Sequence, residues 1–197
     1  MRYLALAVAA YLLGSLPSAY LVVRFARGLD LRSVESGSVG ALNAFRATGS
    51  AWLGAVVLIL DLAKGAAAVM VAGDGAGPMM QSLAATMVVV GHNYPVWLRG
   101  RGGKGLAAAA GALSIVTPLS VPLWAVLWAI GYVASGYIAL GTVVATAGLP
   151  LLLGFFAGWA YAGAAAPVCI LVLLRHTAKV RRLLLGAEPR HYWRGKA

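Results

Sequence analysis

A glycine-rich basic turn joins two apolar segments near the middle of the chain, with the sequence Arg-Gly-Arg-Gly-Gly-Lys-Gly at residues 99–105. Its glycines leave backbone N–H groups accessible, and a helix beginning after Gly105 would aim further free N–H groups and its dipole at the same place. We therefore predict a phosphate site formed by Gly102, Gly103 and Gly105, with the charge neutralised by Lys104. It is not a Walker A loop, since Gly105 follows the lysine. A loop whose charge only sets membrane orientation is the alternative.

A second polar segment, residues 33–49, combines glycines and small hydroxyl residues, among them Ser36 and Ser38, with Asn43 and Arg46. If a helix begins within it, Asn43 and Arg46 point the same way because they are three residues apart. Backbone N–H groups exposed by the glycines would complete a pocket for an anion. The alternative is a flexible cytoplasmic connector.

Three ionisable residues lie within otherwise apolar segments. Asp61 and Lys64 share one face of a predicted helix, either as a mutually neutralising structural pair or as a charged part of a substrate site. His92 lies near the inner end of its predicted helix, shortly before the basic turn. It is either a buried, hydrogen-bonded side chain or a base or phosphate ligand.

The composition places these groups on membrane helices. Of 197 residues, 61% are apolar and 11% are charged, with a mean hydropathy of +0.85, whereas a soluble domain carries about 25% charged residues. These values exclude an ordinary soluble domain, a disordered chain and a disulfide scaffold. The apolar runs are continuous, whereas the strands of a membrane barrel alternate. We predict an all-α integral membrane protein with a single membrane-embedded domain, residues 1–197.

The basic residues indicate how the chain crosses the membrane. The net charge is +11, and all Lys and Arg residues except Arg2 and Lys64 fall within residues 24–46, 99–104 and 175–196. In a membrane protein such clusters mark the cytoplasmic side or bind anionic groups. If all three clusters are cytoplasmic, an even number of crossings must separate them.

Seven crossings satisfy this requirement, with the N-terminus outside and the C-terminus in the cytoplasm. The predicted spans are residues 3–23, 50–72 and 79–98, followed by four within the uncharged stretch 105–174, divided near Thr117-Pro118, Ser135-Gly136 and 150–154. A span needs about 20 residues, so the short segment 105–117 must be flanked by protein. Five longer crossings with re-entrant pieces are the alternative.

The ordered motifs resemble those of the bacterial acyl-phosphate:glycerol-3-phosphate acyltransferase family. The matching segments cover nearly the whole chain in the family's order: residues 14–17, 36–46, 61–65, 91–92, 102–107, 175–176 and 182–189. The resemblance implies a seven-helix, multi-pass enzyme of the bacterial inner membrane with a cytoplasmic active site. It implies transfer of a fatty acyl group from acyl phosphate to the 1-hydroxyl of glycerol 3-phosphate, which gives lysophosphatidate and phosphate.

The resemblance also implies the site. The catalytic residues would be Ser36, His92, Lys104 and His176; the substrate-binding residues would be Ser38, Asn43, Arg46, Gly102, Gly103, Gly105, Lys179 and Glu188. No cofactor, metal or nucleic acid is expected, because acyl phosphate is already activated, and the protein is expected to be a monomer in contact with membrane lipid. The general base stays open among His92, His176 and the substrate's own phosphate.

Several positions depart from the family pattern. Ser38 replaces a usual Asn, Leu42 and Ala108 replace usual Thr residues, and Ala178-Lys179 replaces a Glu-Asn pair. The lost hydrogen-bonding side chains make a related acyltransferase with a different acceptor one alternative. A transporter of lipids or organic anions is another, which would require a polar path to both membrane faces.

Overall fold

The structure, a computed structural model, describes residues 1–73 and 75–190, and every element in them is a helix. In chain order they are α1 (Arg2–Ser15), α2 (Ser18–Arg27), η1 (Leu31–Ser33), α3 (Ala41–Thr48), α4 (Ala51–Met70), α5 (Pro78–Asn93), η2 (Val96–Leu98), α6 (Leu106–Val116), α7 (Ser120–Ser135), α8 (Ile138–Phe156), α9 (Trp159–Leu174) and α10 (Thr177–Leu184). The predicted all-helical class is confirmed. Asp74, between the predicted spans 50–72 and 79–98, and Arg194 and Lys196 of the basic tail lie outside the described residues.

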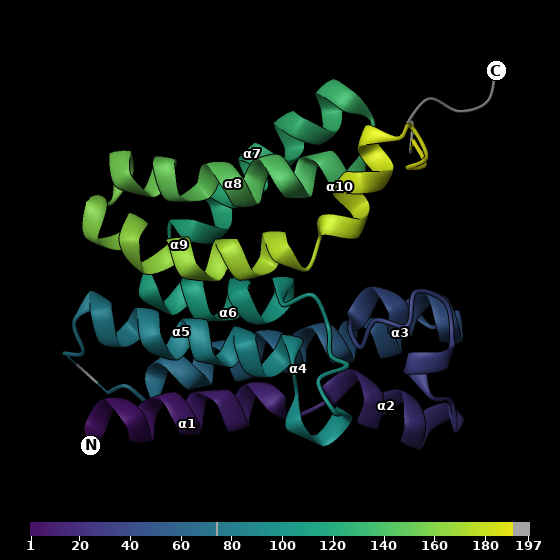
Figure 1. Cartoon of the computed structure of the whole chain (residues 1–197), viewed down its shortest axis with the longest axis horizontal. Helices are drawn as coiled ribbons and strands as arrows, with labels where there is room; N and C mark the ends of the chain where they lie inside the picture. The colour runs from purple at the N-terminus through teal and green to yellow at the C-terminus, as the bar shows by residue number, and fades with distance from the viewer. Residues whose placement is uncertain (74, 191–197) are drawn as a thin grey trace.

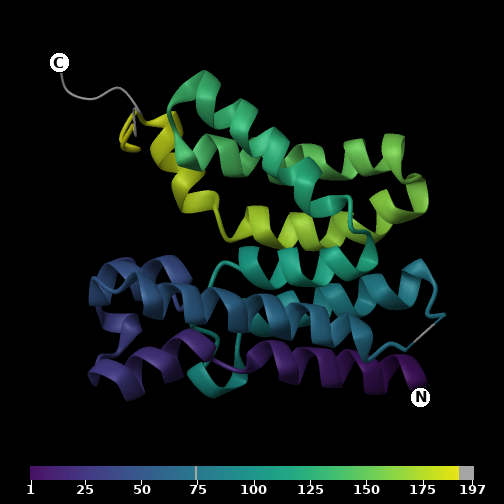
Figure 2. The ribbon, with the colours of Figure 1, turned by 180° about the vertical axis from the view of Figure 1, so that it is seen from behind.

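The longer helices lie side by side in one stack (Figure 1). Helix α1 packs on α5, α4 on α6, and α9 lies between α5 and α8, while α7 packs on the outer side of α8. Figure 2 shows the same order of layers from behind. The short helices α2, α3 and α10 gather at the end of the stack farthest from the N-terminus. The described parts of all three basic clusters therefore meet at one end of the bundle.

Small residues allow the central helices to approach closely. A Cβ atom on Gly65 of α4 would overlap the carbonyl of Ala108, and one on Gly111 of α6 would overlap the carbonyl of Leu62. Such contacts between small residues are typical of helix packing in lipid. Because α4, α5, α7 and α9 all contact α6, this short helix is flanked by protein, as predicted.

One predicted break in the uncharged stretch is wrong. The chain turns near Thr117-Pro118 and Ser135-Gly136 as expected, but Pro150 lies inside α8 and the third break comes at Gly158. Gly158 has a φ of 107°, which residues with a Cβ rarely adopt, so it ends the helix. Pro150 is tolerated because neighbouring helices and local adjustment can satisfy the backbone group that it frees.

The boundaries of two predicted spans also differ from the expectation. The first is interrupted at Leu16–Pro17, which separates α1 from α2, and the predicted segment 79–98 ends as an α-helix at Asn93. In the described residues, three segments are long and apolar enough to cross a membrane: Arg2–Arg27, Ala51–Met70 and Ile138–Phe156. A fourth is added if α9 and α10, which are bent by 61°, count as one; α6 and α7 are shorter apolar helices.

Candidate active site at the basic end of the bundle

The predicted phosphate turn leads directly into a helix N-terminus. After α5 the chain passes through η2, turns at Arg99 and Gly100 in left-handed conformations, and reaches Gly105, which precedes α6 with a φ of 82°. Among residues 1–73 and 75–190, no side chain caps the first N–H groups of α6. The free backbone N–H groups and the positive end of the helix dipole therefore face the space beside the turn. This arrangement favours the binding of an anion.

Three parts of the fold hold this turn in place. The Gly103 N–H donates to the carbonyl of His92 at 3.1 Å, and the Val39 N–H donates to the carbonyl of Gly102 at 3.5 Å. The Arg175 guanidinium at the end of α9 donates from Nε to the Gly103 carbonyl at 3.1 Å and from Nη2 to the Gly102 carbonyl at 3.4 Å. The turn is therefore fixed before any ligand binds.

The second polar segment folds around Asn43. Helix α3 begins at Ala41, and the buried Asn43 accepts at Oδ1 from the N–H and the hydroxyl of Ser36, both at 3.1 Å. Its Nδ2 donates to the carbonyls of Leu31 at 3.2 Å and Val34 at 3.4 Å. These bonds occupy the amide, so Asn43 shapes the loop and places Ser36, which remains exposed beside the half-buried Ser38.

Among the described residues, three cations and one carboxylate surround Lys104. Burial lowers the pKa of Lys104 to about 8, and the positive charges of Lys179 and Arg182 act in the same direction. Arg46 lowers this pKa further, whereas Glu188, which binds Arg182 at 2.7 Å, opposes the effect. Segments far apart in the sequence thus converge on one site with excess positive charge, and a bound phosphate would offset that excess.

His176 lies buried at the bend between α9 and α10. Its Nδ1 is 2.7 Å from the carbonyl of Val172, so Nδ1 carries the proton and donates, which leaves Nε2 as an acceptor. Burial lowers the pKa of His176 to about 4, and the charges of Lys179 and Lys104 contribute. The imidazole is therefore neutral near pH 7 and lies in the same cation cluster.

His92 occupies a different position, under the turn. Its Nδ1 lies 3.5 Å from Oδ1 of Asp61, and Lys64 Nζ lies 2.8 Å from the same oxygen. Lys64 also donates to the carbonyl of Leu16 at 2.9 Å. The two buried residues whose role the sequence left open thus form one cluster with His92.

Two functional candidates were missed by the sequence analysis. Arg175 holds the turn, and its guanidinium carbon lies 5.1 Å from the centre of the Tyr94 ring. It is the first charged residue after the uncharged stretch 105–174. That position could have singled it out. Arg182 begins the matching segment 182–189, but its charge does not stand out in the run of tail cations, and only the fold brings it near Lys104.

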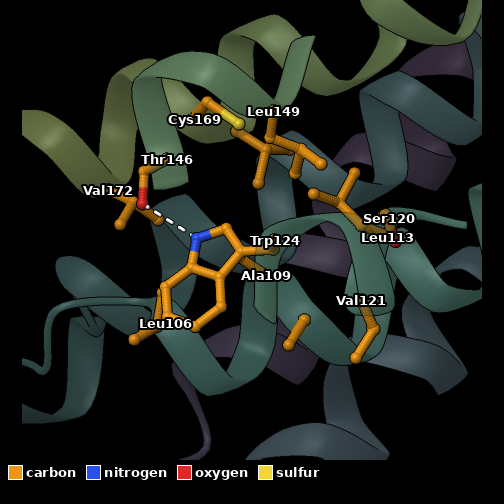
Figure 3. Close-up of a pocket in the computed structure, with 12 residues that line it drawn as sticks. Leu106, Ala109, Leu113, Ser120, Val121, Trp124, Thr146, Leu149, Cys169 and Val172 are labelled. Carbon is orange, nitrogen blue, oxygen red and sulfur yellow. Dashed lines mark hydrogen bonds between the residues drawn. The ribbon is translucent and has the colours of Figure 1, made fainter. Parts of the chain in front are cut away.

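An apolar cavity of about 80 Å³ lies between α6, α7, α8 and α9 (Figure 3). Its wall begins at Leu106, the residue after Gly105, and includes Ala109 and Ala110 of the small-residue segment of α6. Across the cavity, Trp124 Nε1 donates to the hydroxyl of Thr146 at 3.1 Å. An apolar space thus starts directly beside the phosphate turn.

The chain is similar in sequence to glycerol-3-phosphate acyltransferases. The family model described as glycerol-3-phosphate acyltransferase matches residues 4–186. The glycerol-3-phosphate acyltransferase 2 of Moorella thermoacetica is 42% identical over 183 residues, which cover 92% of this chain and 93% of that protein. The glycerol-3-phosphate acyltransferase of Synechococcus sp. (strain CC9902) is 39% identical over 190 residues, covering 95% and 94%.

The fold is similar to crystal structures of PlsY (YgiH), an integral membrane glycerol 3-phosphate acyltransferase. The glycerol 3-phosphate form superposes with a TM-score of 0.86 at 33% identity and covers 98% of this chain and 96% of that one. The lysophosphatidic acid form gives a TM-score of 0.83 at 31% identity, with 96% and 95% covered.

Proposed function

This chain belongs to the glycerol-3-phosphate acyltransferase family, and we propose that it transfers a fatty acyl group from acyl phosphate to the 1-hydroxyl of glycerol 3-phosphate. The products are lysophosphatidate and inorganic phosphate, so the protein acts in phospholipid synthesis. The observation that carries the proposal is the fixed turn at Gly102–Gly105, which opens α6 beside Lys104 and its neighbouring cations. The site lies at one end of the bundle, which favours an enzyme over a transporter with a path to both faces.

The donor spans the boundary between the turn and the apolar cavity. Its phosphate binds the free N–H groups from Lys104 to the start of α6, with the Lys104 ammonium as the counter-charge, while its acyl chain enters between helices along Leu106 and Ala109. Acyl phosphate is a mixed anhydride, so the chemistry needs only orientation and stabilisation of the leaving phosphate. Lys104 supplies that stabilisation.

Glycerol 3-phosphate, the acceptor, binds on the side of Lys104 that faces away from the acyl donor. Arg46, Lys179 and Arg182 neutralise the phosphate of glycerol 3-phosphate, and Glu188 keeps Arg182 oriented. The Ser36 hydroxyl donates its proton to Asn43, so its oxygen is available to accept a hydrogen bond from a hydroxyl of the acceptor. The two substrates therefore approach from lipid and from water.

His176 serves as the general base in this arrangement. Its Nε2 takes the proton of the 1-hydroxyl as that oxygen bonds to the acyl carbonyl carbon; the bond from this carbon to the bridging phosphate oxygen then breaks, and phosphate leaves. Burial is the main cause of the low pKa of His176, and two bound phosphates offset only the added effect of Lys179 and Lys104, which raises this pKa. Substrate binding therefore makes the imidazole a stronger base.

Substitution of Lys104, assigned to the donor phosphate, and of Arg46, assigned to the acceptor phosphate, tests these two roles. Lys104→Ala and Arg46→Ala are each expected to lower turnover by at least ~10²-fold, the scale for loss of one preorganised charge-stabilising group. The control is Arg27→Ala, which removes another exposed cation at the same end of the bundle. Near-normal kinetics in a folded Lys104 or Arg46 variant would remove that residue from the site.

The pKa of Lys104 predicts a basic limb in the pH profile. Since the free protein loses this proton near pH 8, kcat/KM for acyl phosphate is expected to fall about tenfold per pH unit above that value. Bound phosphate stabilises the ammonium, so the corresponding limb of kcat should lie higher. Lys104→Arg should remove the limb, because a guanidinium stays charged. A level kcat/KM up to pH 10, after subtraction of uncatalysed hydrolysis, would contradict the assignment.

The membrane arrangement that we propose has seven crossings, with the active site in the cytoplasm and the N-terminus outside. It is supported by the gathering of the basic clusters at one end of the bundle. In a Cys169→Ala background, Gly77→Cys should react with an impermeant thiol reagent in intact cells, whereas Arg101→Cys and Ala187→Cys should react only after lysis. Reaction of position 101 or 187 from outside would overturn the arrangement.

The donor assignment is tested with the purified protein and saturating glycerol 3-phosphate. Acyl phosphate should support formation of lysophosphatidate, whereas acyl-CoA of the same chain length should not, because no His in the sequence is followed at the fifth position by Asp. Equal rates with acyl-CoA would show that the proposed donor is wrong. Acylation of another acceptor in preference to glycerol 3-phosphate would support the different-acceptor alternative.

A further inference from the structure

A buried ionic cluster lies under the phosphate turn and touches neither substrate in the proposed mechanism. Asp61, Lys64 and His92 are 2%, 7% and 6% exposed. They come from α4 and α5, and together with Gly102 they line a cavity of about 10 Å³. Charged groups are rarely placed inside a membrane bundle without a function.

Asp61 lies between the other two members of the cluster, Lys64 and His92. One carboxylate oxygen, Oδ1, lies 2.8 Å from Lys64 Nζ and 3.5 Å from His92 Nδ1. Lys64 is held in turn by the carbonyl of Leu16, at the break between α1 and α2. The carboxylate therefore faces Nδ1 of the imidazole, and the ring lies between Asp61 and Gly103.

His92 connects this cluster to the turn. Its carbonyl accepts from the Gly103 N–H at 3.1 Å, and its ring lies so close to Gly103 that a Cβ there would overlap Nε2. Because the ring packs directly against Gly103, a ring that turned away from this position would withdraw its support from Gly103 and from the neighbouring Lys104. The ring and backbone of one residue thus set the place of the phosphate donors.

We propose that Asp61 and Lys64 are positioning residues for the reaction, acting through His92 on the turn at Gly103–Lys104. This inference rests on the proposed function of that turn. In this arrangement His92 positions the turn, and His176 is the general base. The competing explanation is a neutralised pair that only joins helices, and an apolar pair of similar size would then replace it without loss.

The double variant Asp61→Leu/Lys64→Met separates the two explanations, because replacing a buried ion pair by apolar residues is often neutral or stabilising. We expect thermal stability near that of the wild type, but a kcat at least ~10-fold lower, the range for a small misplacement of catalytic groups. The KM for glycerol 3-phosphate should change little, since the acceptor binds other cations. Hydrogen exchange at the Gly103 amide should become faster. The control is Ser82→Ala, which removes a partly buried hydrogen bond to the Ala164 carbonyl and should change neither kcat nor the exchange at Gly103.

Wild-type kcat and wild-type exchange at Gly103 in the folded double variant would overturn the inference while the proposed function stands. Should the double variant not fold, Asp61→Asn decides. It keeps the shape of the side chain and loses the charge, and the same fall in kcat with faster exchange is expected; unchanged values would overturn the inference. Failure of the wild type to form lysophosphatidate would instead refute the proposed function.

Discussion

Replacement of Gly103 by valine is expected to abolish acyl transfer while the protein still inserts and folds. A Cβ at this position would overlap Nε2 of His92 and lie 2.7 Å from the carbonyl oxygen of Val39. Both neighbours are held in place, His92 by burial and Val39 by its bond to Gly102. The turn must therefore move, which takes its N–H groups and Lys104 away from the donor phosphate.

The measurement is turnover of the purified Gly103→Val variant together with its thermal unfolding. Gly163→Val is the matched control, since a Cβ on Gly163 of α9 would meet nothing within 4 Å. This control should keep wild-type activity. A fully active, normally folded Gly103→Val protein would contradict the placement of the phosphate at the turn.

Replacement of His176 by alanine is expected to lower kcat by ~10²–10⁴-fold, the range for loss of a general base. The basis is geometric: Val172 holds the proton on Nδ1, so Nε2 is the atom available to the acceptor hydroxyl. KM values should change much less than kcat, because the cations that bind the phosphates remain. If kcat of a folded His176→Ala variant stays near the wild-type value, the base is the substrate's own phosphate or His92.

The local motifs near the site could be predicted from the sequence because their physical signals are contiguous. Glycines followed by Lys104 and a helix indicate an anion site, and the uncharged stretch 105–174 indicates packed membrane helices. The prediction of a break at Pro150 was wrong because proline is tolerated within membrane helices, whereas Gly158 ends the helix through its φ angle. Sequence patterns do not distinguish these two cases.

The contacts within the site could not be predicted, since they depend on tertiary packing. Asn43 was expected to bind the substrate, but its amide is occupied by Ser36 and the backbone of its own loop. Arg175 bonds to a turn more than seventy positions away. Whether Asp61 and Lys64 were structural or functional depended on a third residue, His92, which only the packing of α4 against α5 brings near.

A product balance with the purified protein tests whether the enzyme couples phosphate release to acylation of glycerol 3-phosphate. Acyl phosphate and glycerol 3-phosphate are supplied together, and inorganic phosphate and lysophosphatidate are both quantified, with the acyl position determined. We predict equal amounts of the two products, acylation at the 1-hydroxyl, and loss of both in Lys104→Ala. Release of phosphate without lysophosphatidate, or a lipid product formed equally well by Lys104→Ala, would contradict the account.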